Sequence, residues 1–146
     1  MKKILTFIVN ENKEILLLHN NYEDPSHGGD IWYTVTGAYE KCDKNIEDTV
    51  IREVMEETNL DVLESKYLNV VCNYKQNNND CREYFYVSFV KKENVKLNGE
   101  WIDYKWLTLN EFVNKCHFYY DKEVLYNILN KGIDKELYYK EEIELN

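Results

Sequence analysis

The feature that most restricts how this chain folds is a run of carboxylates on one predicted helix, which begins after Asn45 and ends at Asn59. Glu53, Glu56 and Glu57 are three and four residues apart, so they share an arc of roughly 100° on the helix surface. Like charges at this spacing repel one another. A divalent cation would remove this penalty, because Mg²⁺ takes oxygen ligands and is usually held by a few carboxylates together with substrate phosphates. The helix therefore predicts a metal site.

The other side of this helix predicts how it packs against the rest of the chain. Four apolar residues occupy the arc beside the carboxylates and are expected to face a core: Val50, Ile51, Val54 and Met55. Asn45 is expected to cap the N-terminus, with Asp48 three residues on in capping-box position. Asn59 is expected to end the helix, since asparagine tolerates the left-handed conformation found at helix C-termini.

Short runs rich in β-branched and aromatic residues predict strands on both sides of this helix. They are residues 3–9, 14–18, 31–36, 67–75, 82–90 and 101–107. The polar segment 20–30 contains the only proline and predicts a loop, and residues 77–80 predict a turn between two antiparallel strands.

Two short helices are expected after the last strand. Thr108 is expected to cap the first, with Glu111 completing a capping box. The second spans residues 121–130, with Gly132 as its stop signal. Residues 133–146 form an acidic tail that is expected to fray, although its apolar and aromatic residues Leu137, Tyr138 and Tyr139 could dock on the domain. Together these elements predict one domain over residues 1–146, an α/β/α sandwich around a mixed sheet.

The overall charge excludes some classes of partner. The formal net charge is −9 and no cluster of Lys and Arg exists, so binding to a nucleic-acid polymer is not expected. A small anionic substrate stays compatible with this charge, because a bound metal inverts the local electrostatics. No segment approaches the ~20 apolar residues of a membrane span. The four cysteines show neither CxxC spacing nor the density of a disulfide scaffold, which predicts reduced thiols in a cytoplasmic protein.

The run REVMEETNL, from Arg52 to Leu60, resembles the second half of the signature of the Nudix hydrolases. That signature is Gly, five residues, Glu, seven residues, then Arg-Glu-U-x-Glu-Glu-x-Gly-U, where U is a bulky aliphatic residue. Family spacing counted back from Arg52 places Lys44 where Glu belongs and Ala38 where Gly belongs. A shift by one residue gives Gly37 and Asp43 at the correct separation, followed by eight residues. We prefer this one-residue insertion, because it restores a glycine and a carboxylate.

The resemblance extends beyond this motif and covers roughly residues 3–130. The run ILLLHNNYEDPSHGGDIWYTVTG is similar to the strand, loop and Trp-containing strand that precede the motif in the family. Residues 100–107, EWIDYKWL, resemble a Glu-x-x-x-Tyr-x-Trp-Leu pattern of two Nudix groups. These are the dATP or dihydroneopterin-triphosphate pyrophosphohydrolases and the diadenosine tetraphosphate hydrolases. The resemblance thus implies a Nudix-type fold.

The resemblance also implies roles for particular residues. Glu53, Glu56 and Glu57 would supply most ligands of Mg²⁺ or Mn²⁺, and the carbonyl of Gly37 is a candidate addition. Either Glu53 or Glu100 would act as general base toward the attacking water. Arg52 would fix the carboxylates through a salt bridge.

The implied reaction is hydrolysis of a diphosphate bond in a nucleoside triphosphate or a related compound. Diadenosine polyphosphates and nucleotide sugars are alternative substrates. A Nudix-fold module that binds a nucleotide without catalysis, or a purely structural acidic domain, are the rival interpretations. The partner would be a small molecule, and both a monomer and a homodimer are compatible with the sequence.

Three tyrosines are candidates for contact with the substrate ring. Tyr74 and Tyr84 lie on predicted strands and would stack on a base, although tyrosine-rich strands need no ligand. Tyr104 belongs to the EWIDYKWL run. Its alternation with Lys105 and Trp106 favours a core position instead.

Overall fold

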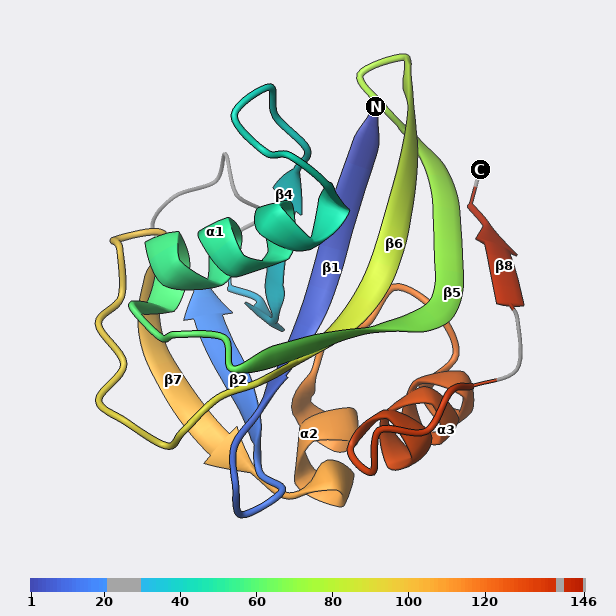
Figure 1. Ribbon diagram of the computed structural model, residues 1–146. Helices are drawn as coiled ribbons and strands as arrows, with labels where there is room; N and C mark the ends of the chain where they lie inside the picture. Colours follow the sequence, from blue (N-terminus) through green and yellow to red (C-terminus); the bar gives the residue numbers. More distant parts are fainter. Residues whose placement is uncertain (21–29, 139–140, 146) are drawn as a thin grey trace.

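An eight-stranded mixed sheet separates helix α1 (Ile46–Thr58) from helices α2 (Leu109–Lys115) and α3 (Lys122–Gly132) (Figure 1). The computed structural model describes residues 1–20, 30–138 and 141–145. The strands are β1 (Lys2–Val9), β2 (Ile15–Asn20), β3 (Trp32–Tyr33), β4 (Val35–Ala38), β5 (Glu64–Gln76), β6 (Asn79–Phe89), β7 (Trp101–Leu107) and β8 (Glu141–Glu144). This arrangement confirms the predicted α/β/α sandwich.

Strand β1 connects the parts of the sheet. The main strand order is β3-β2-β1-β6-β5-β8, with β4 paired to β1 and β7 paired to β2. β1 runs parallel to β6 and antiparallel to both β2 and β4. Because β4 and β2 pair with different halves of β1, the chain that leads into α1 starts from the middle of the sheet.

Alternation along β1 explains why both faces of the sheet are covered. Leu5, Phe7 and Val9 belong to the core that also contains residues of α2 and α3. Ile4 and Ile8 pack on the other face with residues of α1. Successive side chains of a strand point to opposite faces, so a continuous apolar run fits a strand that is buried on both sides.

Both ends of α1 carry the predicted caps. The side chain of Asn45 accepts a hydrogen bond from the backbone N–H of Asp48 at 2.9 Å. The carboxylate of Asp48 accepts from the backbone N–H of Lys44 rather than of Asn45, so the reciprocal contact of a capping box is displaced by one residue. Asn59 adopts the left-handed conformation, with φ of 62°, and ends the helix as predicted.

The buried stripe of α1 differs from the predicted one. Val50 and Val54 are fully buried, whereas Ile51 and Met55 are 44% and 38% exposed. The buried stripe continues from Val54 to Glu57 instead. Ile51 and Met55 each follow a buried valine by one residue. Their side chains are therefore rotated by roughly 100° around the helix axis from the side that faces the sheet. The expectation that all four apolar residues face the core was therefore wrong for these two.

The predicted strand 31–36 is two strands. β3 pairs with β2, and β4 pairs with β1, so the chain changes partner between them. Thr34 lies at this change and donates its hydroxyl proton to the carbonyl of Thr6 at 2.6 Å. Gly37 belongs to β4 and pairs with Ile4, so this strand continues past the predicted end at residue 36. Of the predicted loop 20–30, residues 21–29 lie outside the part that the structure describes.

The hairpin of β5 and β6 and helix α3 are longer than predicted. Strands β5 and β6 are joined at Asn77 and Asn78, whose φ values of 50° and 65° suit a tight two-residue turn. Gly132 is the last residue of α3 and not a stop after it. A Cβ there would lie 3.0 Å from the side chain of Leu68, so the glycine allows close packing on β5.

The acidic tail contributes a strand where fraying was expected. β8 pairs in parallel with β5, and Arg82 of β6 forms an ion pair of 2.7 Å with Glu142. Strand alternation was hard to detect in so acidic a run, but the free edge of β5 offers it backbone partners. Tyr138 is buried and Leu137 is exposed, while Tyr139 lies outside the described residues.

Two further expectations concern disulfides and membranes. All four cysteines are free. No helix in the described ranges is long and apolar enough to cross a membrane.

Candidate active site

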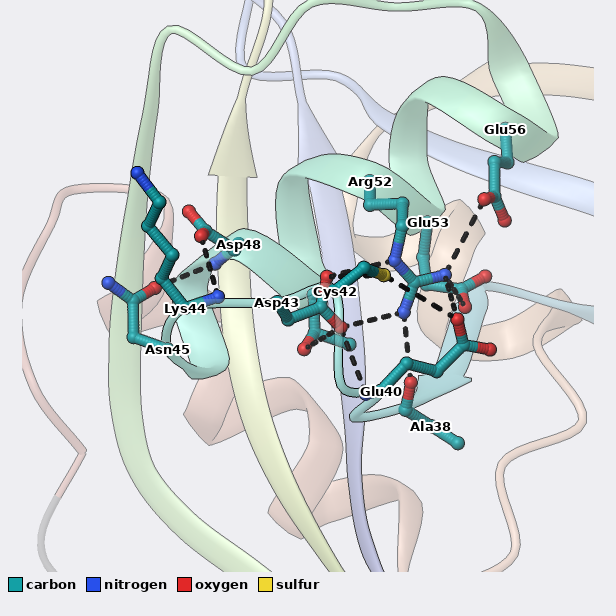
Figure 2. A network of polar contacts seen from close by, with 11 residues as sticks. Ala38, Glu40, Cys42, Asp43, Lys44, Asn45, Asp48, Arg52, Glu53 and Glu56 are labelled. Carbon is teal, nitrogen blue, oxygen red and sulfur yellow. Dashed lines mark hydrogen bonds and ion pairs between the residues drawn. The ribbon is translucent and has the colours of Figure 1, made fainter.

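Arg52 occupies the centre of a polar network between the loop after β4 and helix α1 (Figure 2). Its Nε and Nη2 donate to the two carboxylate oxygens of Asp43 at 3.0 and 2.9 Å. Its Nη1 donates to Glu53 at 2.9 Å, and Nη2 also donates to the carbonyl of Ala38 at 3.0 Å. Hydrogen bonds from Arg52 hold the pKa of Asp43 well below its usual range. Arg52 therefore carries the predicted salt bridge to Glu53 and is itself fixed by Asp43.

Asp43 is buried and has further partners of its own. It accepts from the hydroxyl of Thr49 at 2.9 Å and from the backbone N–H of Glu40 at 3.0 Å. Lys44 contacts the helix through its backbone N–H, which donates to Asp48 at 3.0 Å. The structure thus places Asp43, not Lys44, against Arg52, as the one-residue shift of the motif requires.

Gly37 leaves space that Glu53 fills. A Cβ at position 37 would lie 2.2 Å from Cδ of Glu53 and 2.4 Å from its Oε1. Real atoms do not approach so closely, so any side chain at position 37 would displace this carboxylate. The glycine of the motif therefore has a steric reason: it lets the Glu53 side chain lie across β4.

Glu57 has a donor that sequence reasoning missed. Its side chain is 4% exposed and accepts a hydrogen bond of 2.7 Å from Nε1 of Trp101, the first residue of β7. The available signal was the position of Trp101 next to Glu100 in the EWIDYKWL run. Nothing in the sequence indicated that its ring nitrogen would reach α1.

The carboxyl groups on this side of α1 repel one another. Burial raises the pKa of Glu57 to about 9, and the charges of Glu53 and Glu100 act in the same direction, against the hydrogen bond from Trp101. Burial also raises the pKa of Glu53, with the nearby Glu56 adding to the effect and Arg52 opposing it. A divalent cation bound at these carboxylates would lower the pKa of both groups again, because it favours their ionised forms.

The donor set fits such a cation in kind. All candidate ligands are oxygens, which suit Mg²⁺ and Mn²⁺. Within the described residues no three His, Cys, Asp or Glu side chains form a ready-made cage. Glu53 is held by Arg52, Glu57 by Trp101, and the side chain of Glu56 is 54% exposed and lies 3.5 Å from Arg52. Small side-chain rotations of these glutamates would therefore accompany binding.

A cavity of about 410 Å³ lies beside these carboxylates. It is lined by Asn20, Ile31, Tyr33, Thr34, Thr36, Gly37, Glu53, Glu57, Glu100 and Trp101. Of the predicted site residues it thus brings together Gly37, Glu53, Glu57 and Glu100. We call it the carboxylate cavity.

The three candidate tyrosines lie elsewhere. Tyr104 packs against the apolar cluster that contains Val54, as the core interpretation of its strand predicts. Tyr84 packs against Tyr67, and its hydroxyl accepts from Arg82 at 3.2 Å. Neither lines the carboxylate cavity, whereas Tyr74 lines a neighbouring one.

Comparison with known proteins assigns the chain to a family. Residues 2–128 match the NUDIX domain. The chain belongs to the Nudix family. It is therefore placed among hydrolases that act on phosphoric anhydrides, generally with a divalent cation, which confirms the predicted enzyme class.

This Nudix domain is similar to several characterised proteins. It is 27% identical over 126 residues to the dihydroneopterin triphosphate diphosphatase of Haemophilus influenzae, over 77% of each chain. Its fold is similar to that of the E. coli dihydroneopterin triphosphate pyrophosphohydrolase, with a TM-score of 0.67, 18% identity, and 91% and 95% of the two chains covered. A C. elegans Ap4A hydrolase is also similar, with a TM-score of 0.61, 18% identity, and 88% and 92% covered.

Proposed function

We propose that this Nudix protein hydrolyses a diphosphate bond in a nucleoside or pterin triphosphate and releases pyrophosphate. The observation that carries the proposal is the carboxylate cavity, which gathers Glu53, Glu57 and Glu100 around the backbone of Gly37. The activity named for the Haemophilus influenzae relative favours a triphosphate. The Ap4A hydrolase makes diadenosine polyphosphates the next candidates, followed by nucleotide sugars.

The glutamates of α1 are the proposed holders of Mg²⁺ or Mn²⁺. Glu53, Glu56 and Glu57 supply carboxylate oxygens, and the carbonyl of Gly37 is a fourth candidate. A divalent cation, when bound, neutralises phosphate oxygens and lowers the pKa of an attacking water. The four groups lie on two adjoining elements, α1 and β4, so their positions depend on the packing of this helix on the sheet.

The remaining residues orient groups and move a proton. Arg52 holds Glu53 across β4, and Trp101 holds Glu57. Either Glu53 or Glu100 accepts a proton from the water that attacks phosphorus. The bond from that phosphorus to the bridging oxygen breaks, and pyrophosphate leaves with the electron pair.

The proposed partner is a small phosphorylated molecule, and the proposed location is the cytoplasm, which the four free thiols support. The enzyme would act as a monomer or a homodimer. Size-exclusion chromatography with light scattering distinguishes these two states directly.

A panel of nucleoside and pterin triphosphates, dinucleoside polyphosphates and nucleotide sugars tests this proposal. Each compound is incubated with Mg²⁺, with Mn²⁺ and with EDTA, and the products are identified. We expect turnover of triphosphates with either metal and none with EDTA. Glu57→Gln should lower kcat by at least about 100-fold, since it removes a charge beside the reacting phosphate.

Glu93→Gln is the matched control, because Glu93 is exposed and does not line the carboxylate cavity. It removes the same charge and should leave turnover unchanged. Tight binding of a nucleotide without turnover, and without any effect of metal, would instead favour the binding-module interpretation. An absence of saturable Mg²⁺ binding would favour the structural one.

A further inference from the structure

A second cavity, of about 340 Å³, adjoins the carboxylate cavity. Ile31, Tyr33 and Thr36 line both cavities, so the two share a wall. We call the second one the Glu83 cavity, after the carboxylate on its surface. Its volume falls within the ~300–1,000 Å³ typical of small-molecule sites. A substrate with its phosphates at the glutamates of α1 would have space for its ring here.

Glu83 is an unusual residue for its position on β6. It is 2% exposed, and on the same face of the strand it is followed, two and four residues further along, by the fully buried core residues Phe85 and Val87. It makes no ion pair within the described ranges, and it accepts a hydrogen bond of 3.0 Å from the hydroxyl of Tyr119. Burial raises the pKa of Glu83 to about 7, against hydrogen bonds from Tyr119 and Tyr74 and the charge of Lys3.

Burying such a carboxylate costs free energy, and packing of the core gives no reason for it, because an apolar residue would fill the same position without this cost. Its two oxygens provide about four acceptor positions, of which the tyrosines use only part. The remaining acceptor capacity lies on the wall of the cavity. Glu83 is therefore suited to receive N–H donors from a ligand.

Tyr33 provides a second, independent observation. Its hydroxyl is buried and has no hydrogen-bond partner among the residues that the structure describes. Buried polar groups are nearly always hydrogen-bonded, so an unpartnered one indicates a missing partner. Tyr33 lines the wall between the two cavities, where a ligand that spans them would pass.

The other walls suit a flat ring. Tyr74 and Tyr119 line the cavity with their aromatic side chains. Tyr119 stacks on Phe118 with ring centroids 4.8 Å apart, and its ring also lies against that of Tyr33 at 6.4 Å. Aromatic walls favour a planar ligand, and polar groups at one edge then fix its orientation.

We propose that Glu83 recognises the 2-amino-4-oxopyrimidine edge of the substrate's ring, the edge that guanine and pterins share. This proposal rests on the proposed function and narrows its substrate class. The edge carries an N–H beside an amino group, two donors that match the two oxygens of a carboxylate. Adenine presents an amino group beside a ring acceptor. Uracil and thymine present one N–H between two carbonyl oxygens, which a carboxylate repels.

The test measures kcat/KM for GTP, dihydroneopterin triphosphate, ATP and UTP with the wild type and with Glu83→Gln. We expect the wild type to prefer the first two by about 100-fold or more, because sites built around hydrogen bonds strongly reject ligands that lack them. Glu83→Gln should reduce this preference at least tenfold. The better substrate of these two then shows whether the recognised ring is guanine or a pterin.

Tyr33→Phe separates ligand binding from folding. It removes only the unpartnered hydroxyl, so Tm should stay equal or rise while guanosine and neopterin bind more weakly in metal-free calorimetry. Tyr126→Phe is the matched control, because Tyr126 is exposed on α3, and it should change neither quantity.

The outcomes separate the two proposals. Turnover with no preference among rings, or a Glu83→Gln variant that keeps the wild-type preference, overturns the role of Glu83 and leaves the proposed function intact. Binding of guanosine or neopterin that depends on Glu83, without hydrolysis of any triphosphate, overturns the proposed function and leaves the Glu83 cavity as a ring site.

Discussion

Replacement of Gly37 by alanine offers the sharpest test of how the site is built. The added Cβ would lie 2.2 Å from Cδ of Glu53, and ordinary contacts begin at 3.4 Å. The carboxylate must therefore move by at least about 1.2 Å. A misplacement of ~1 Å in an active site is associated with a loss of about 100-fold in rate, which is the fall in kcat that we expect.

The same substitution should not destabilise the fold. Gly37 does not adopt a positive φ, so alanine fits its backbone conformation, and the atoms it meets belong to a flexible side chain. Replacing glycine at a compatible position stabilises a protein by about 0.4–1 kcal/mol, which partly offsets a weakened contact between Glu53 and Arg52. Loss of activity with a nearly unchanged Tm is thus the signature of a displaced carboxylate.

The assay pairs triphosphate hydrolysis at saturating Mg²⁺ with thermal unfolding followed by circular dichroism. Gly132→Ala is a suitable control, since it also adds one methyl group but lies on α3 against Leu68, away from the carboxylate cavity. It should retain full activity. Full activity in Gly37→Ala would show that the position of Glu53 is unimportant. A collapse of Tm would show that the backbone, not the side chain, absorbs the clash.

Three other predictions concern stability. Trp101→Phe removes the donor to Glu57 and should lower the free energy of unfolding by about 1–3 kcal/mol in urea titrations, whereas no change would mean that this hydrogen bond is unimportant. Mg²⁺ at about 100 times its Kd should stabilise the wild type by ~2.7 kcal/mol but not Glu57→Gln, and an equal rise in Tm for both would place the ion elsewhere. The pKa of Glu83 is raised from 4.5 to about 7, so the folded state holds this proton longer than the unfolded state. Between pH 4.5 and a pH above 7, the free energy of unfolding of the wild type should therefore fall by about 3 kcal/mol more than that of Glu83→Gln. Parallel pH profiles of the two proteins would contradict this.

Local signals in the sequence were sufficient for the helix that carries the site. The order Arg-Glu-Val-Met-Glu-Glu, the cap at Asn45 and the left-handed Asn59 depend on neighbours within one or two turns. They defined α1 and the spacing of its carboxylates. The choice of Asp43 over Lys44 was also open to sequence reasoning, because restoring a carboxylate at the motif position leaves Arg52 with a partner.

Features that depend on distant parts of the chain were predicted less well. Ile51 and Met55 follow the apolar pattern of the helix, yet which arc meets the sheet is decided by the orientation of α1 on β1 and β4. The change of strand partner at Thr34 has the same origin. The residues of a strand do not indicate at which position its pairing changes from one neighbouring strand to another, here from β2 to β1.

The sequence by itself determined the family, the fold class and the chemical character of the site, because each of these depends on residue types at short, regular spacing. Only the tertiary structure brought Trp101 and Glu100 to the glutamates of α1. It also placed the buried Glu83 on the wall of the same cavity as Tyr33, whose hydroxyl has no hydrogen-bond partner among the described residues. These contacts join strands and helices that are far apart in the chain. These groups can bind a ligand strongly because they are buried, and burial strengthens electrostatic interactions and hydrogen bonds. A local pattern of residues does not show which groups become buried together.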